Sequence, residues 1–204
     1  MGLSIHYRGQ IKENALIDEL ISEAVDICKS LSWNHLIFEK TGNANDKAHV
    51  NDPGFINYSE NDLKGISFVP EDCEPVSLVF FPSGRLCCPF KLMNNNPATN
   101  DLMAETISTK TQYAGMDVHI TVLKLLQYFK DKYFSVFELS DEGNYWETKD
   151  AAVLKAQFDR YNFLVDTVHD ALSSIKAVPG ETPQSLADRI EEILKKKVVK
   201  ERKK

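Results

Sequence analysis

The chain has 204 residues, of which 43% are hydrophobic and 26% charged, and its formal net charge is −6. These values are close to the average of globular domains, and they exclude collagen-like, disordered and disulfide-scaffold proteins. No apolar run approaches the ~20 residues that cross a bilayer, and the first ten residues lack the apolar segment of a signal peptide. We therefore expect a soluble, cytoplasmic protein with no membrane partner.

The charge is unevenly distributed along the chain. Lys195–Lys204 holds seven of the 24 basic residues and one of the 30 acidic ones, which leaves 17 basic and 29 acidic residues, a net charge of −12, in residues 1–194. An acidic body repels phosphate groups, so the folded part is not expected to bind nucleic acid. The basic tail is typical of a solvated helix end, and contact with an anionic surface is the alternative.

The four cysteines carry no recognisable redox or metal pattern. Cys28, Cys73, Cys87 and Cys88 form neither a CxxC pair nor a Cys/His set with the spacing of a zinc site. We therefore expect reduced cysteines, no metal site and no cofactor.

The chain begins with a predicted strand–helix–strand unit. Leu3–Arg8 alternates apolar and polar residues with period two, residues 15–31 place apolar side chains at helical spacing, and His35–Glu39 predicts a second strand. A unit of this length normally crosses over into a parallel or mixed sheet.

A hairpin is predicted further along the chain, after the irregular stretch Thr41–Lys64, whose length is typical of a functional or mobile loop. Strands are predicted over Gly65–Val69, Val76–Phe81 and Arg85–Phe90, and the last two flank the turn Pro82-Ser83-Gly84. In that turn Pro fixes φ and Gly supplies a positive φ. A second loop, rich in Asn and Pro, begins at Met93, and Glu105–Thr111 predicts a polar strand at an edge or a cavity.

Two more helices and a short strand follow. A helix is predicted over Asp117–Tyr133 with Asp117 as its N-cap, and Ser135–Leu139 predicts a strand that ends at an acidic turn. The longest helix, from Asp150 to Ile175, has apolar residues at alternating steps of three and four, which is a heptad seam. Such a seam indicates either a core helix lying across a sheet or a helix pair, and the second case predicts a homo-oligomer through helix 150–175.

The C-terminal part completes the predicted architecture. Pro179-Gly180 ends the long helix, and Thr182-Pro183 begins the last one with Thr182 as N-cap. Together the elements predict an α+β fold: two layers, a mixed but largely antiparallel sheet with helices packed on one face, and a C-terminal helical pair. We expect a single domain over residues 1–204, with 1–149 as the α+β body and 150–204 as a helical hairpin with the basic tail.

One candidate site lies at the start of the second predicted helix. The sequence contains no P-loop, GxGxxG, GxSxG, HExxH or EF-hand motif. However, Lys110, Thr111 and Gln112 precede a helix N-terminus, whose unsatisfied N–H groups could hold a carboxylate or phosphate. His119, in the first turn, is a candidate base because a helix N-terminus disfavours its cationic form. The alternative is a capped helix with a half-buried histidine bonded to the backbone.

A second candidate cluster is the acidic turn of residues 141–147. Asp141, Glu142 and Glu147 follow directly after a strand, and close to His119 they could bind a divalent metal or perform acid–base chemistry. Their spacing matches no ligand motif, and a solvated turn whose aromatic residues cover the core is the alternative. His6, on the polar face of the first strand, is a third candidate, and an ordinary surface histidine is the alternative there.

The two clusters, TKTQYAGMDVHITVLKLLQYFKDKYF and ELSDEGNYWET, resemble an uncharacterised family of small bacterial proteins that begins with a strand like SIHYRG. The resemblance covers most of residues 1–150 and implies a bacterial protein, but it supplies no activity and no site residue. The acidic body and the heptad seam favour a non-enzymatic interaction or self-associating protein. The alternative is a small-ligand binder or enzyme with a polar pocket between the start of helix 117–133 and the acidic turn 141–147.

Overall fold

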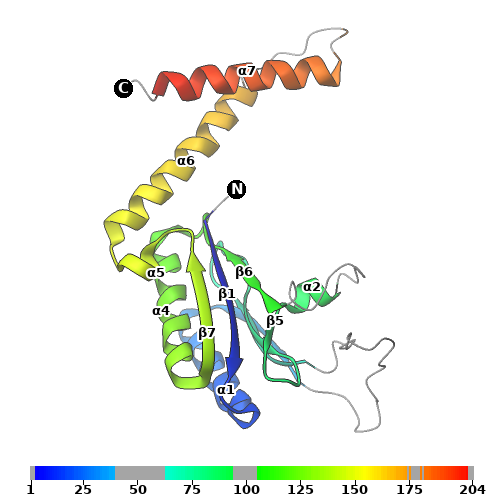
Figure 1. Cartoon of the computed structure of the whole chain (residues 1–204), viewed down its shortest axis with the longest axis vertical. Helices are drawn as coiled ribbons and strands as arrows, with labels where there is room; N and C mark the ends of the chain where they lie inside the picture. Colours follow the sequence, from blue (N-terminus) through cyan, green and yellow to red (C-terminus); the bar gives the residue numbers. More distant parts are fainter. Residues whose placement is uncertain are drawn as a thin grey trace. The chain divides into compact units, whose positions relative to one another are not determined.

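Two antiparallel sheets and the helices that cover them form the α+β fold that the sequence predicts (Figure 1). The computed structural model describes residues 3–39, 63–93, 105–173, 175, 180 and 182–201. Most of the predicted irregular stretch, residues 41–62, and residues 94–97 of the second loop lie outside these ranges. The chain divides into two units, Met1–Leu154 and Lys155–Lys204.

The first sheet has three strands with the N-terminal strand in the centre. β1 (Ser4–Ile11) pairs antiparallel with β6 (Ile107–Lys110) on one side and with β7 (Phe134–Asp141) on the other, as Figure 1 shows. Alternation along β1 buries Ile5 and Tyr7 and turns His6 and Arg8 outward. The outer face of β1 is therefore polar.

The second sheet contains the predicted hairpin. Its strands are β2 (Asn34–Phe38), β3 (Lys64–Val69), β4 (Val76–Phe80) and β5 (Leu86–Cys87), in that order. The turn between β4 and β5 is confirmed, with Gly84 at a φ of 81°. The predicted strand Arg85–Phe90 is too long, because Pro89 begins the short helix α2 (Pro89–Met93), and proline is favoured at the first helical position.

The predicted parallel crossover is wrong. β1 and β2 lie in different sheets, and every strand pair within the described ranges is antiparallel. The reason is that β6 and β7 occupy both edges of β1, so β2 pairs with β3 instead. The Tyr7 side chain links the two sheets: its buried hydroxyl donates to Ser77 O at 3.1 Å and accepts from Ser77 N at 2.9 Å.

Two long helices cover the shared core. A 3-10 turn, η1 (Asn14–Leu16), leads into α1 (Ile17–Leu31). The last residue of α4 (Gly115–Tyr133) contacts Glu19 near the start of α1, so the two helices run antiparallel. Glu23 links them, because it accepts a hydrogen bond from Tyr128 at 2.9 Å and also pairs with Lys132. Their apolar stripes and the inner faces of both sheets form one core cluster. Asp117 is not the N-cap as predicted: Ala114 is, and Asp117 lies in the first turn.

Three helices follow β7. They are α5 (Tyr145–Thr148), α6 (Ala151–Ser173) and α7 (Pro183–Glu201). Thr182 caps α7 as predicted, since its hydroxyl accepts from Ser185 N at 3.2 Å. Along the heptad seam of α6, Leu154 and Phe158 are buried, whereas Val165, Val168 and Leu172 are exposed. Among the described helices, none has the length and apolar character that crossing a membrane requires.

Candidate functional site

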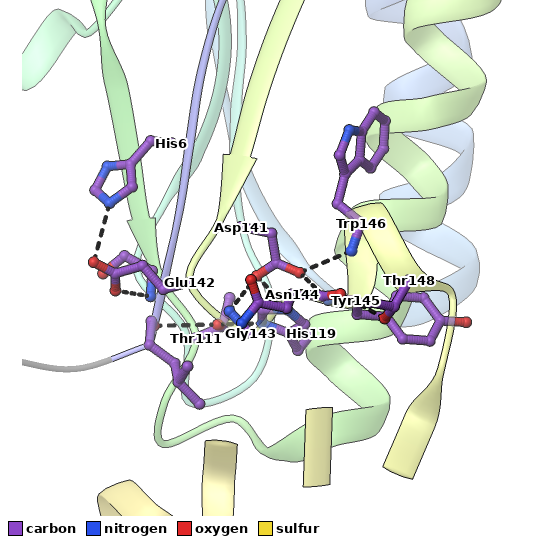
Figure 2. Close-up of polar contacts among 12 residues, drawn as sticks. His6, Thr111, His119, Asp141, Glu142, Gly143, Asn144, Tyr145, Trp146 and Thr148 are labelled. Atoms are coloured by element: carbon purple, nitrogen blue, oxygen red, sulfur yellow. Dashed lines mark hydrogen bonds and ion pairs between the residues drawn. The ribbon is translucent and has the colours of Figure 1, made fainter. Parts of the chain in front are cut away.

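The helix entrance and the acidic bend converge on one buried contact (Figure 2). His119 lies in the first turn of α4, and Asp141 is the last residue of β7. His119 Nε2 lies 3.0 Å from Asp141 Oδ1, and both side chains are 0% exposed. The start of α4 and the acidic turn therefore meet at this pair.

Thr111 completes the cluster on the other side of the imidazole. Its Oγ1 lies 2.6 Å from His119 Nδ1 and 3.3 Å from Leu3 O, and its N–H donates to the same carbonyl at 2.9 Å. If the imidazole is neutral, Nδ1 accepts a hydrogen bond from the threonine hydroxyl. If it is an imidazolium, Nδ1–H donates to Oγ1, and the hydroxyl donates to Leu3 O instead. The threonine hydroxyl can thus satisfy either protonation state of His119.

Asp141 also organises the turn that follows it. Its Oδ1 accepts from Gly143 N at 2.7 Å, and its Oδ2 accepts from Tyr145 N at 2.8 Å and Trp146 N at 3.0 Å, the first amides of α5. Burial alone would raise the pKa of Asp141, but His119 and the backbone N–H donors outweigh burial and hold that pKa below its usual value. The carboxylate therefore remains ionised at neutral pH.

Gly143 is the residue that allows this packing, and the sequence analysis did not single it out. A Cβ at this position would lie 2.5 Å from Leu154 Cδ1 and 3.0 Å from both Asp141 Oδ1 and His119 Nε2. Its neighbours therefore leave no room for a side chain. The sequence does carry a signal that Asp141 points inward. Side chains two residues apart in a strand share a face, and Asp141 therefore lies on the same face as Phe137 and Leu139.

Glu142 points the other way and forms a separate, exposed pair. Its backbone N–H donates to Ser4 O at 3.2 Å, and its Oε2 accepts from Ser4 N at 2.9 Å. Its Oε1 lies 3.5 Å from His6 Nε2, and both side chains are about two-fifths exposed. Figure 2 shows this pair on the other side of the bend from Asp141. A shallow groove of about 280 Å³ on the outer face of the sheet begins at His6 and includes Arg8, Glu138 and Ser140.

The other predicted site residues do not join the buried contact. The Lys110 ammonium lies 5.5 Å from the centre of the Tyr113 ring, and Lys110 N donates to Glu74. Gln112 is buried, and in the part of the chain that the structure describes its Oε1 has no hydrogen-bond partner. Glu147 lies exposed in α5. Within the same ranges, no group of three His, Cys, Asp or Glu side chains could hold a metal ion.

Thr111, His119 and Asp141 are linked in a row, as the residues of a proton relay are. Their burial, however, limits which molecules can reach them. The side chains of His119 and Asp141 are closed to solvent, and Thr111 is fully buried, so no substrate atom reaches the hydroxyl in this conformation. The cluster links the residue after β6 and the chain before β1 to α4, β7 and α5. Its bonds to the Asp141 carboxylate are charge-assisted, which are the stronger kind. Comparison with protein-family models, with curated proteins and with solved structures finds no match for this chain.

Proposed function

We propose that this chain is a non-enzymatic interaction protein that self-associates through α6. The observation that carries the proposal is the exposed half of the heptad seam. Val165, Val168 and Leu172 continue the spacing of the buried Leu154 and Phe158, and Leu172 is 50% exposed. A seam of this kind stabilises a helix when a second helix covers it.

The buried cluster supports the same proposal. His119, Asp141 and Thr111 bind one another and the backbone, and such a closed arrangement fits an anchor of the fold better than a reaction centre. The acidic body, with its net charge of −12 over residues 1–194, fits a protein that acts through protein contacts rather than on nucleic acid.

Light scattering coupled to size exclusion, over a series of protein concentrations, tests the proposal. We expect the mass to exceed that of one chain at high concentration, and to return to that of one chain in Val165→Glu and Leu172→Glu. Ala156→Glu is the matched control, because Ala156 is exposed on the same helix but off the seam. A protein that is monomeric throughout, or equally associated in all three variants, contradicts the proposal.

A bacterial, cytoplasmic location belongs to the proposal too. All four cysteines are free, and burial raises the pKa of the Cys28 thiol to about 11 and that of Cys73 to about 12. Thiols of this kind remain inert in a reducing compartment.

A small-ligand binder or enzyme is the second candidate, and the exposed His6–Glu142 pair favours it. Ser4 fixes Glu142, and Glu142 lies beside His6 at the groove of the first sheet, so Nε2 of the imidazole is oriented towards a carboxylate. NMR of the His6 ring during titration with acetate or inorganic phosphate tests this candidate. We expect a saturable shift that Arg8→Gln weakens, because Arg8 supplies a positive charge to the groove, and a linear, variant-independent response would contradict the candidate.

A further inference from the structure

A cavity of about 510 Å³ lies at the C-terminus of α1, where the chain enters β2. Residues 31–34 form one wall, and residues 69–72, at the end of β3 and in the turn that leads to β4, form the other. Its volume lies in the range of small-molecule sites, about 300–1,000 Å³. None of its lining residues belongs to the groove at His6 or to α6.

The charged side chains that line this cavity are both acidic. They are Glu71 and Asp72, and the lining residues include no Lys, Arg or His. Within the described ranges, neither carboxylate has a hydrogen bond or an ion pair, whereas the exposed carboxylate of Asp18 pairs with Lys64. The cavity therefore carries two negative charges that the described part of the chain does not neutralise.

The end of α1 adds partial negative charge to the same wall. Ser32 adopts a left-handed conformation with a φ of 56°, and its N–H donates to the carbonyls of Cys28 and Lys29. The next two carbonyls, of Ser30 and Leu31, accept no backbone hydrogen bond within the described ranges. Unsatisfied carbonyls make the C-terminus of a helix favourable for a cation.

An aromatic ring and two aliphatic side chains supply the rest of the binding surface. The half-buried Trp33 ring stacks on Phe68 with the ring centroids 5.8 Å apart and an angle of 10° between the planes, which fixes the indole at the wall. Tryptophan is the side chain whose ring attracts cations most strongly. Leu31 is 43% exposed and Val69 is 39% exposed, so each wall also offers apolar surface to a methylene chain.

These walls fit an organic cation better than a metal ion, because two carboxylates are few for a metal and the described chain has no group of three His, Cys, Asp or Glu side chains that could hold one. We propose that the cavity binds an aliphatic diamine or polyamine. Its ammonium group, which is protonated at neutral pH, donates to Glu71 and Asp72, and its methylene chain lies between Leu31 and Val69 beside Trp33. The proposal goes beyond self-association through α6 and is independent of it.

Titration of the full-length chain with hexamethylenediamine, followed by NMR of the Trp33 indole N–H, tests the proposal. The chain has two tryptophans, and Trp33→Phe assigns the signal. We expect a saturable shift with the diamine and none with hexanediol, which has the same chain of carbon atoms without the charge. Magnesium at equal ionic strength measures general attraction to the acidic body and should give no saturable shift.

A pair of double variants locates the binding. Glu71→Gln with Asp72→Asn should weaken the affinity for the diamine about tenfold, because the ammonium group loses both carboxylates. Glu13→Gln with Asp26→Asn is the matched control, since it removes the same charge from two exposed acids outside the cavity and should leave the affinity unchanged. All four acids are exposed, so neither double variant removes a buried contact.

Three outcomes would overturn the proposal. The first is no saturable response of the wild-type chain to the diamine. The second is an equal response to magnesium, because the diamine would then only screen negative charge. The third is saturable binding with the same affinity in both double variants, because the amine would then bind elsewhere. None of them bears on self-association through α6, which is measured by mass.

Discussion

Replacing Asp141 by Asn tests whether the buried cluster anchors the fold. The carboxylate accepts from Gly143 N, Tyr145 N and Trp146 N and lies 3.0 Å from His119 Nε2. An amide has one acceptor oxygen where the carboxylate has two, so its NH₂ group must face either the Gly143 amide and the imidazole or the two α5 amides. At least one buried donor is then left without an acceptor.

The size of the effect follows from these contacts. A hydrogen bond to a charged group contributes about 1.5–3 kcal/mol, and breaking a buried charged pair costs about 3–5 kcal/mol. We expect Asp141→Asn to lower the free energy of unfolding by about 3 kcal/mol, measured by urea denaturation with tryptophan fluorescence. Asp18→Asn is the control, because Asp18 pairs with Lys64 on an exposed surface and should cost less than about 1 kcal/mol. A loss of under 1 kcal/mol for Asp141→Asn would refute the anchoring role.

Three further predictions use the same denaturation assay. Because the pKa of Asp141 is lowered in the folded state, the stabilisation by its carboxylate is present above about pH 4, the unfolded pKa, and disappears as the pH falls through the folded pKa. The Asp141→Asn difference should therefore shrink at acid pH, and a constant difference would argue against the ionised carboxylate. Gly143→Ala should cost about 2 kcal/mol, since the new Cβ would lie 2.5 Å from Leu154 Cδ1; an unchanged midpoint would mean that the helix start moves freely. Tyr7→Phe should also cost about 2 kcal/mol, because the backbone N–H and C=O of Ser77 both lose their partner, and a neutral result would indicate that water replaces the hydroxyl.

The local patterns of the sequence predict the elements well, and pairing between distant strands is where prediction fails. Helical spacing identified α1 and α4, and Pro82-Ser83-Gly84 identified the hairpin, because these signals lie within a few residues. The edge to which β2 pairs is not a local property. It depends on β6 and β7, which pair with the two edges of β1 and leave none for β2. Both strands lie about 70 or more residues further along the chain.

The candidate site shows the same division. The sequence analysis named an approach of the acidic turn to His119 as the condition for a shared site, and the 3.0 Å contact with Asp141 meets that condition. It did not predict that consecutive carboxylates point apart, Asp141 inward and Glu142 outward. That difference follows from extending β7 to Asp141, which pairs with Ile5, whereas the expected strand ended at Leu139. The grouping of Lys110, Gln112 and Glu147 into the same pocket stays a prediction.

The Tyr7 hydroxyl has a consequence for how this unit comes apart. One phenolic oxygen takes the place that a neighbouring peptide would fill beside Ser77, so the two sheets share a bond that belongs to neither ladder. If either sheet opens, the Tyr7 hydroxyl or the Ser77 backbone in the other sheet loses its hydrogen-bond partner. Deep amides of β1 and β4 should therefore exchange through a common event, with the pair of sheets behaving as one cooperative element.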